Sequence, residues 1–357
     1  MTKPLTILMT GAHITPAVAV TQEILRKVPN ARIIYAGRAG NKAESFSVER
    51  SEIERAGGIF KTVISGKLHR FFTWSQLMEF GKFPVGLLQS ALLLLKEKPQ
   101  AVVSFGGYLS VPFVITARLV GIPVIIHEET TVWGMANRIC RRWASVVAVS
   151  WPKMQEAGTV LTGNPMPKEI VEAGRGGNAK KERSRPMIYV TEGSQSSLVI
   201  SKIVKQILNQ LLEFADVYHQ TKYPALDINS SRYHSARWFP TPEHAILLSR
   251  ASIAISRSGA NTITYHAYFG IPSILVPLPH AGENEQMKNA ALLSETGLAR
   301  IVPQKDFTAD RLLLEIRNLL AIPGDQWKEI RIRAQGLVNP DAASQLADLV
   351  LSAALQQ

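Results

Sequence analysis

The chain has 357 residues, of which 46% are hydrophobic and 19% charged, so it is long enough for two domains and too apolar to be disordered throughout. Its single cysteine, Cys140, excludes a disulfide framework and fits a reducing compartment. Lysine and arginine outnumber aspartate and glutamate by 40 to 28, and this net charge of +12 favours phosphorylated ligands or anionic membranes. No nucleic-acid-binding motif accompanies the charge, so we expect no nucleic-acid partner.

The N-terminal residues show no targeting signal. They lack the long apolar segment and the small-residue cleavage site of a signal peptide. No run in the chain reaches the roughly 18 apolar residues needed to span a bilayer. We therefore expect a cytoplasmic protein.

Short apolar segments alternate with helical patterns in the first half of the chain. The expected strands are residues 5–9, 32–36, 59–64, 101–105, 123–126, 146–149 and 159–162. Helices are expected near residues 16–27, 46–56, 110–120 and 137–143. Repeated units of this kind predict a doubly wound parallel sheet that binds ligands outside the carboxyl ends of its strands. His13 lies on the turn after the first strand, where both a catalytic and a structural role are open.

Residues 66–95 are apolar on too many sides for a simple surface helix. Basic residues beside exposed aromatic residues suit a helix on an anionic membrane surface, and a helix hairpin packed in the core is the alternative. We assign residues 92–95 to the core and residues 68–83 to a membrane-facing surface. The predicted membrane patch comprises Lys67, Arg70, Phe71, Phe72, Trp74 and Phe83.

The proline-bearing joint at residues 163–167 marks the expected domain boundary, which gives domains 1–162 and 163–340. A last helix in residues 341–357 is expected to pack back on the first domain, and residues 173–186 are expected to form a flexible surface loop. The expected strands of the second half are residues 187–191, 216–220, 236–239, 251–256 and 273–276. One helix is expected to end near residue 214, and further helices are expected at residues 260–269, 284–293, 309–320 and 325–335.

Residues 256–289 contain two helix N-termini that open on one edge of the second predicted sheet. A helix N-terminus presents unpaired N–H groups and partial positive charge, so this edge suits a diphosphate. An ordinary β–α–β unit with no ligand has the same pattern, because a fold does not fix a function.

Five spaced motifs together resemble the MurG family of glycosyltransferases, and they keep the family's order over most of the chain. The motifs are Thr10-Gly11-Ala12-His13, Gly106-Gly107-Tyr108, His127-Glu128 with Asn137, Gly163-Asn164-Pro165 with Gly193-Ser194-Gln195, and residues 257–289. The resemblance implies an α/β GT-B fold, with two Rossmann-like doubly wound domains facing across a cleft. It implies inverting transfer of N-acetylglucosamine from UDP-N-acetylglucosamine to the muramyl 4-hydroxyl of lipid I, which makes lipid II for peptidoglycan.

The resemblance also implies a role for each matched residue. His13 corresponds to the general base, and the expected acceptor-binding residues are Thr10, Gly11, Tyr108, Glu128 and Asn137. The expected donor-binding residues are Gly193, Ser194, Gln195, Arg257, Ser258, Gly259, Ala260, Tyr265, Gln286 and Asn289. No metal site and no required cofactor are expected, although a non-essential divalent cation is compatible with the reaction. The protein is expected to act peripherally at the cytoplasmic face of the inner membrane.

The chain departs from the family pattern mainly in the donor half. Tyr265 replaces a glutamate that contacts the ribose, and Glu192 replaces a glycine, where a carboxylate repels a diphosphate unless it points away. Two alternatives follow: a GT-B transferase with another nucleotide-sugar or acceptor, and a non-catalytic homologue retained as a membrane-associated scaffold.

Overall fold

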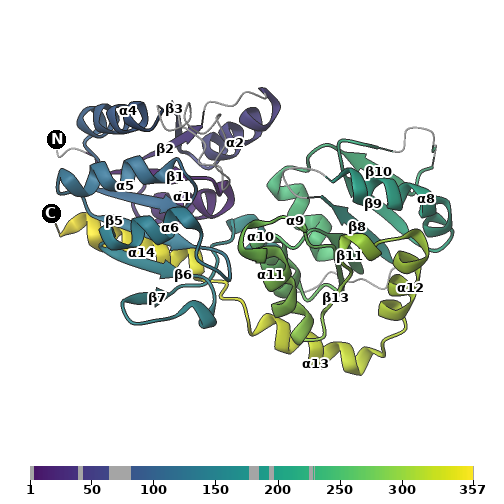
Figure 1. The fold of residues 1–357 in the computed structure, drawn as a ribbon. Helices are drawn as coiled ribbons and strands as arrows, with labels where there is room; N and C mark the ends of the chain where they lie inside the picture. Colours follow the sequence, from purple (N-terminus) through teal and green to yellow (C-terminus); the bar gives the residue numbers. More distant parts are fainter. Residues whose placement is uncertain are drawn as a thin grey trace. The chain divides into compact units, whose positions relative to one another are not determined.

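The computed structural model describes residues 4–38, 43–63, 82–176, 185–192, 197–224, 228 and 230–356. The chain forms two compact units (Figure 1). Unit 1 comprises Met1–Pro167 and Pro340–Gln357, and unit 2 comprises Lys168–Asn339. The division therefore falls after Pro167, five residues beyond the boundary that the sequence suggested at residue 162.

Unit 1 is built on a seven-stranded parallel sheet with the strand order β3-β2-β1-β4-β5-β6-β7. The order reverses between β1 and β4, and in open α/β sheets ligands bind at such a reversal, outside the carboxyl ends of the strands. The strands are β1 (Thr6–Gly11), β2 (Arg32–Arg38), β3 (Ile59–Val63), β4 (Ala101–Phe105), β5 (Val124–Glu128), β6 (Val146–Val149) and β7 (Thr159–Leu161).

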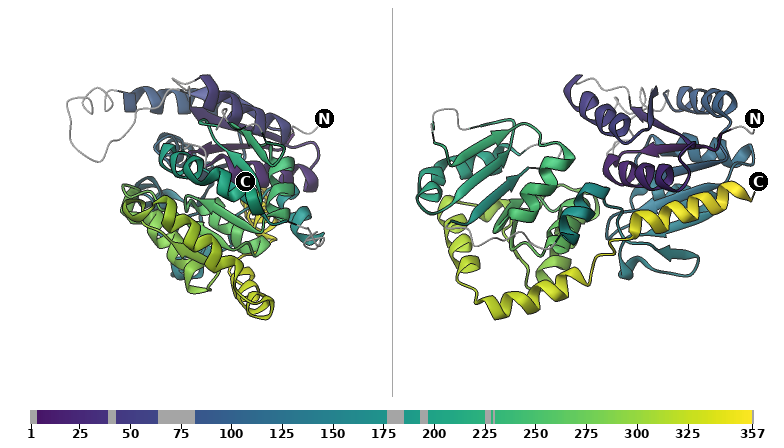
Figure 2. Two further views of the ribbon diagram at one scale, coloured as in Figure 1. Left: turned by 90° about the vertical axis from the view of Figure 1, so that its right-hand side faces the viewer. Right: turned by 180° about the vertical axis from the view of Figure 1, so that it is seen from behind.

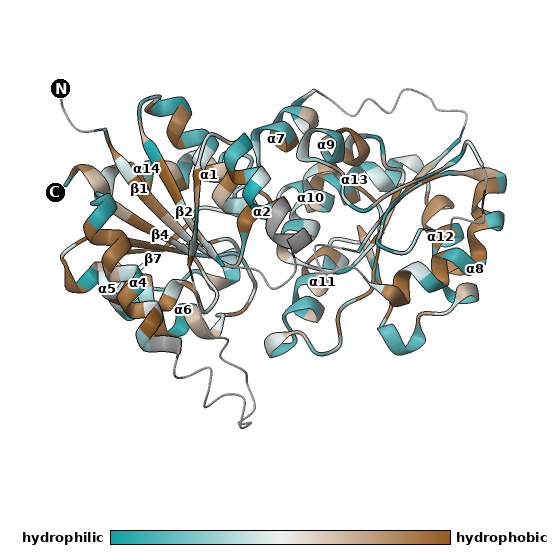
Figure 3. Cartoon of the chain, turned by 90° about the horizontal axis from the view of Figure 1, so that it is seen from above, coloured by the Kyte–Doolittle hydropathy of each residue, from teal (hydrophilic) through white to brown (hydrophobic). Residues whose placement is uncertain are grey.

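Helices cover both faces of this sheet, and each face has its own apolar core. Burial on both faces explains why the strands are continuous apolar runs instead of alternating patterns (Figure 3). Helices α1 (Ile14–Lys27) and α14 (Ala342–Leu355) pack on one face, and α4 (Lys82–Glu97), α5 (Ser110–Leu119) and α6 (Met135–Cys140) pack on the other. Helix α2 (Ala43–Arg55) packs beside α1.

Helix α14 returns to unit 1 after the chain has formed unit 2 (Figure 2). Its side chains Leu346 and Val350 are fully buried in the same core as Ile24 of α1. The Lys27 ammonium also pairs with the Asp348 carboxylate at 2.5 Å. Helix α14 is thus part of the core of unit 1.

Helix α4 corrects one prediction. Residues 92–95 were assigned to the core, but only Leu94 is buried, whereas Leu92 and Leu95 are exposed. The reason is that α4 lies on the outside of unit 1, so successive leucines point in different directions around it. The predicted membrane patch at residues 67–74 lies outside the described residues, as does the side chain of Phe83.

Unit 2 contains a six-stranded parallel sheet with the order β10-β9-β8-β11-β12-β13, which reverses between β8 and β11. The sequence placed one strand at residues 236–239, whereas β10 ends at Ala236 and Phe239 packs against Tyr189. The three-residue strand β13 was not predicted. The strands are β8 (Met187–Thr191), β9 (Asp216–Gln220), β10 (Tyr233–Ala236), β11 (Ile253–Ser256), β12 (Ser273–Leu275) and β13 (Ala299–Ile301).

The helices of unit 2 also lie on both faces of its sheet. Helices α8 (Leu198–Phe214) and α12 (Ala309–Leu320) bury apolar side chains in a core shared with β8, β9, β11 and β12. Helices α9 (Thr241–Arg250), α10 (Ala260–Phe269), α11 (Glu285–Glu295) and α13 (Gly324–Gln335) complete the unit with α7 (Lys168–Arg175). Helix α7 occupies the start of the expected loop at residues 173–186, of which residues 177–184 lie outside the described ranges.

Candidate functional site

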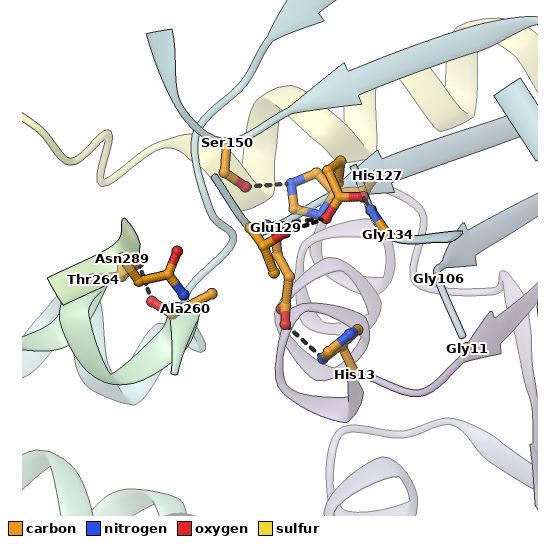
Figure 4. Close-up of polar contacts among 12 residues, drawn as sticks. Gly11, His13, Gly106, His127, Glu129, Gly134, Ser150, Ala260, Thr264 and Asn289 are labelled. Atoms are coloured by element: carbon orange, nitrogen blue, oxygen red, sulfur yellow. Dashed lines mark hydrogen bonds and ion pairs between the residues drawn. The ribbon is translucent and has the colours of Figure 1, made fainter. Parts of the chain in front are cut away.

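The loops after β1 and β4 touch where the strand order of unit 1 reverses (Figure 4). The backbone N–H of Ala12 donates to the carbonyl oxygen of Gly106 over 3.0 Å. Gly107 has a φ of +79°, and a Cβ at this position would lie 2.6 Å from the Cβ of Ala12. Glycine therefore lets the two loops approach each other, and their contact fixes the start of the turn that carries His13.

His13 stands at the N-terminus of α1, with its side chain 41% exposed. Its Nδ1 lies 2.5 Å from Oε1 of Glu129, whose own side chain is only 6% exposed (Figure 4). Glu129 follows β5, which is separated from β1 by β4, so the loops after β1 and β5 bring the imidazole and the carboxylate together at one edge of the sheet. Sequence reasoning identified His13 but missed Glu129, and the only available signal was a second carboxylate beside Glu128.

Glu128 and Asn137 were expected to line the acceptor site, but both are buried and bond to each other. The Glu128 carboxylate also accepts hydrogen bonds from the backbone N–H groups of Thr130 and Gly134 and from the Thr130 hydroxyl. The Asn137 amide additionally donates to the carbonyl oxygen of His127. Direct contact with an acceptor stays a prediction, whereas the geometry shows these two side chains bracing the loop after β5.

Thr10 lies in β1 where the sequence predicted a turn, and its expected contact with an acceptor stays a prediction. Its side chain is fully buried, and its hydroxyl donates to the carbonyl oxygen of Ala36 in β2 over 3.1 Å. This hydrogen bond links β1 to β2, because Thr10 lies within β1 instead of on the turn. Gly11 ends the strand and accepts a hydrogen bond from the Tyr35 hydroxyl, while Tyr108 lies exposed in the loop after β4.

Three other histidines are held by interior contacts. Burial lowers the pKa of His127 to about 4, and its Nε2 lies 3.1 Å from both the Gly163 carbonyl oxygen and the Ser150 hydroxyl. Burial likewise lowers the pKa of His244 to about 4 and that of His266 to about 3. These imidazoles are neutral near pH 7 and are oriented for structure, in contrast to the partly exposed ring of His13.

In unit 2, Arg257 follows β11 at the reversal of strand order. Its guanidinium donates to the Ser197 hydroxyl at 2.8 Å, to Oε1 of Gln304 at 2.7 Å and to the carbonyl oxygen of Val276 at 2.9 Å. Burial lowers the pKa of Arg257, and the negative charge of Glu192 acts in the opposite direction. The side chain expected to bind a donor therefore ties together the loops after β8, β12 and β13.

The expected sugar-side residues tie the starts of α10 and α11 together. The Ser258 hydroxyl donates to the Gln286 carbonyl oxygen at 2.7 Å, and the Asn289 amide donates to the Ser258 carbonyl oxygen at 3.2 Å. The Gln286 side-chain oxygen accepts the N–H of Leu278. Gly259 caps α10 and Ala260 is its first residue, so the first turn of this helix lies at the expected diphosphate site.

Glu192 follows β8, and its carboxylate points into unit 2. It accepts the backbone N–H of Ser197 at 2.9 Å and the hydroxyls of Ser201 and Thr221, and it lies 3.4 Å from Nε2 of His219. The carboxylate is thus buried and hydrogen-bonded within unit 2, and its effect on a bound diphosphate stays a prediction. The expected donor residues Gly193, Ser194 and Gln195 lie outside the described residues.

Tyr265, the other donor-half departure, is buried in α10. Its ring packs edge-on against His244 with 5.8 Å between the centroids, and Nδ1 of His244 lies 2.9 Å from the Tyr189 hydroxyl. Most of the Tyr265 side chain therefore packs α10 against α9, and its predicted contact with a nucleotide stays a prediction.

Neither a cluster of metal-ligating side chains nor a membrane-spanning helix occurs in the described part of the chain. No group of three or more histidine, cysteine, aspartate or glutamate side chains there is arranged to hold a metal ion. Within the same ranges, no helix combines the length and the apolar character that crossing a membrane requires.

Comparison with known proteins matches both units to one family. Residues 5–149 match the glycosyltransferase family 28 N-terminal domain, and residues 187–345 match the family's C-terminal domain. Relatives from Nostoc sp. and Nitrobacter hamburgensis, both named UDP-N-acetylglucosamine–N-acetylmuramyl-(pentapeptide) pyrophosphoryl-undecaprenol N-acetylglucosamine transferase, are each 32% identical. The match to the Nostoc protein covers 96% of this chain and 94% of that protein. The match to the Nitrobacter protein covers 99% of this chain and 98% of that protein. The crystal structure of Acinetobacter baumannii MurG superposes with a TM-score of 0.73 at 22% identity over 98% of this chain and 100% of that chain.

Two doubly wound parallel sheets, each with polar loops at its strand-order reversal, define a glycosyltransferase of the GT-B class. The chain belongs to glycosyltransferase family 28 and, within it, to the MurG family.

Proposed function

We propose that this protein transfers N-acetylglucosamine from UDP-N-acetylglucosamine to the muramyl 4-hydroxyl of lipid I, with inversion, to form lipid II. Membership of the MurG family supports the reaction. The observation that carries the chemistry is His13, a partly exposed imidazole at the strand-order reversal of unit 1. Two glycine turns and the exposed Tyr108 lie at the same edge.

In the proposed reaction, Nε2 of His13 takes the proton of the 4-hydroxyl while its oxygen forms a bond to the anomeric carbon of the donor sugar. The bond from that carbon to the β-phosphate oxygen breaks, and its electron pair leaves with UDP. The N-terminus of α10 at Gly259 and Ala260 stabilises this negative charge, so the chemistry requires no metal ion. Gln286 and Asn289 position the transferred sugar, and Arg257 holds the donor loops in place.

The proposal is tested with purified protein, a water-soluble lipid I analogue and a panel of nucleotide-sugars. UDP release is expected to require both UDP-N-acetylglucosamine and the analogue, and the product mass is expected to increase by one N-acetylhexosamine. Calorimetry is expected to show tighter binding of UDP-N-acetylglucosamine than of donors with other nucleotides or sugars. If another nucleotide-sugar binds more tightly, UDP-N-acetylglucosamine is not the donor; the burial of Tyr265 is the reason to measure this. If the protein binds membranes but no donor, the scaffold alternative is supported.

We further propose that unit 1 binds the cytoplasmic face of the membrane through the outer face of α4. Val85, Leu88, Leu92 and Leu95 are exposed and recur at intervals of three and four residues, so they form one apolar stripe along the helix. The stripe continues in sequence from the basic, aromatic residues 67–83, and the two features together suit an anionic lipid surface. A lipid-linked acceptor requires the protein at that surface.

Replacing Leu88 and Leu92 together by glutamate is expected to weaken binding to vesicles containing anionic lipid by at least about tenfold. Each leucine contributes on the order of 1.5 kcal/mol when it is buried in lipid, and the new charges add repulsion. Vesicle co-sedimentation measures the effect. The matched control is Leu314→Glu on α12, which removes an exposed leucine from unit 2. Equal binding by the double variant and wild type would refute the role of the stripe.

A further inference from the structure

The imidazole of His13 is held by a carboxylate from another loop. Nδ1 of His13 lies 2.5 Å from Oε1 of Glu129, and the acid is far more buried than the imidazole. The backbone of Glu129 is itself fixed, because its carbonyl oxygen accepts the indole N–H of the buried Trp151 over 2.9 Å. The contact therefore joins a partly exposed ring to an anchored acid.

We propose that Glu129 is a positioning residue that sets the tautomer and the basicity of His13; the proposal rests on the proposed function. A carboxylate that accepts the Nδ1 proton leaves Nε2 with its lone pair, which is the form a general base needs. When Nε2 takes the acceptor proton, the resulting imidazolium stands beside a negative charge, which stabilises it. Glu129 gains no proton in this step.

The adjacent acid, Glu128, does not compete for this role. Its two carboxylate oxygens accept hydrogen bonds from Thr130, Gly134 and Asn137, all within the loop and helix that follow β5. Consecutive residues at the end of a strand point in opposite directions, so Glu128 turns into its own loop while Glu129 turns towards His13. Glu128 therefore stabilises the loop after β5, and Glu129 contacts His13.

Two titratable groups that interact with the pair, His127 and Tyr35, keep one protonation state near neutral pH. His127 interacts with both His13 and Glu129, and burial holds its pKa at about 4. Burial, with smaller effects from Glu49 and Glu129, raises the pKa of Tyr35. A titration between about pH 5 and pH 9 that responds to position 129 therefore reports on the pair formed by His13 and Glu129.

The sharpest variant is Glu129→Gln, because its amide oxygen still accepts the Nδ1 proton but carries no charge. We expect kcat to fall by about 10- to 100-fold, since the imidazolium loses its counter-charge. The acid limb of the kcat/KM profile is expected to move to lower pH by about one unit, because an uncharged neighbour no longer favours the protonated ring. Glu129→Asp retains the charge and restores part of the rate, whereas donor affinity measured by calorimetry is unchanged in both variants.

A readout independent of turnover separates this proposal from the proposed function. ¹⁵N-histidine NMR of the full-length protein follows the titration and tautomer of His13, which the His13→Gln variant assigns. The expected result is a lower titration midpoint in Glu129→Gln than in wild type. An unchanged midpoint, with the fold confirmed by its amide spectrum, would overturn the proposal even if the enzyme is active. A shifted midpoint in a protein without transferase activity would refute the proposed reaction and leave the pair established.

Kinetic coupling provides a second criterion. If Glu129 acts only through His13, the double variant His13→Gln/Glu129→Gln is no slower than His13→Gln alone, because the second change has nothing left to position. Multiplied losses in the double variant would show that Glu129 acts separately, and they would contradict its assignment as a positioning residue.

Discussion

Replacing His13 by glutamine is expected to lower kcat by about 10²- to 10⁴-fold, the usual contribution of a general base. Glutamine is close to histidine in size, and its amide N–H can donate to Glu129 as Nδ1 does, but it cannot take a proton from the acceptor hydroxyl. Binding of the donor by unit 2 is expected to stay unchanged. Steady-state UDP release with a lipid I analogue measures kcat, and calorimetry measures donor affinity.

The matched control is His234→Gln. His234 is exposed in unit 2, where it stacks on Tyr218, and nothing in the proposed reaction uses it. Its replacement is expected to leave kcat within about twofold of wild type, because a surface substitution away from the site changes little. Full turnover by His13→Gln would remove His13 from the mechanism and would require another group to take the proton.

Replacing Gly107 by alanine is expected to lower the free energy of unfolding by about 3 kcal/mol and to reduce kcat. A positive φ costs an alanine about 1–2 kcal/mol. At Gly107 the new methyl group would also lie 2.6 Å from the Cβ of Ala12, and relieving such overpacking costs typically about 1–3 kcal/mol more. Because Ala12 precedes His13, the relief displaces the general base. Urea denaturation and UDP release measure the two effects.

Gly121 isolates the steric part of this prediction. Its φ of +81° nearly equals the +79° of Gly107, but a Cβ there would meet no atom within 4 Å. Gly121→Ala is therefore expected to cost only the backbone strain, about 1–2 kcal/mol, and to leave kcat unchanged. Equal losses of stability in the two variants would show that the contact between the two loops is not tight.

Much of the fold could be predicted because buried parallel strands are continuous apolar runs, which are recognised without knowledge of their partners. Elements whose boundaries depend on tertiary packing were predicted less well. The apolar side chain of Phe239 led to a strand being predicted as far as residue 239. In the structure its ring, just before α9, packs against Tyr189. Strand β13 was missed because Arg300 interrupts its short apolar run.

The candidate site was predictable where a residue type and its place on a sheet edge coincide, as for His13. It was not predictable where function depends on the direction of a side chain. Glu128 and Glu129 are chemically identical in sequence, and only the packed loops decide which of them reaches the imidazole. Glu192 is a similar case, because its charge is harmless to a phosphate only if the side chain turns inwards.

The return of α14 has a consequence for biosynthesis. Leu346 and Val350 belong to the core of unit 1, yet the ribosome makes them only after all of residues 168–339. The first 167 residues therefore emerge without α14, and the part of the apolar face that α14 covers beside α1 stays exposed while the whole of unit 2 is translated. Unit 2 is one continuous segment, so all the residues of its core are synthesised before those of unit 1 are complete.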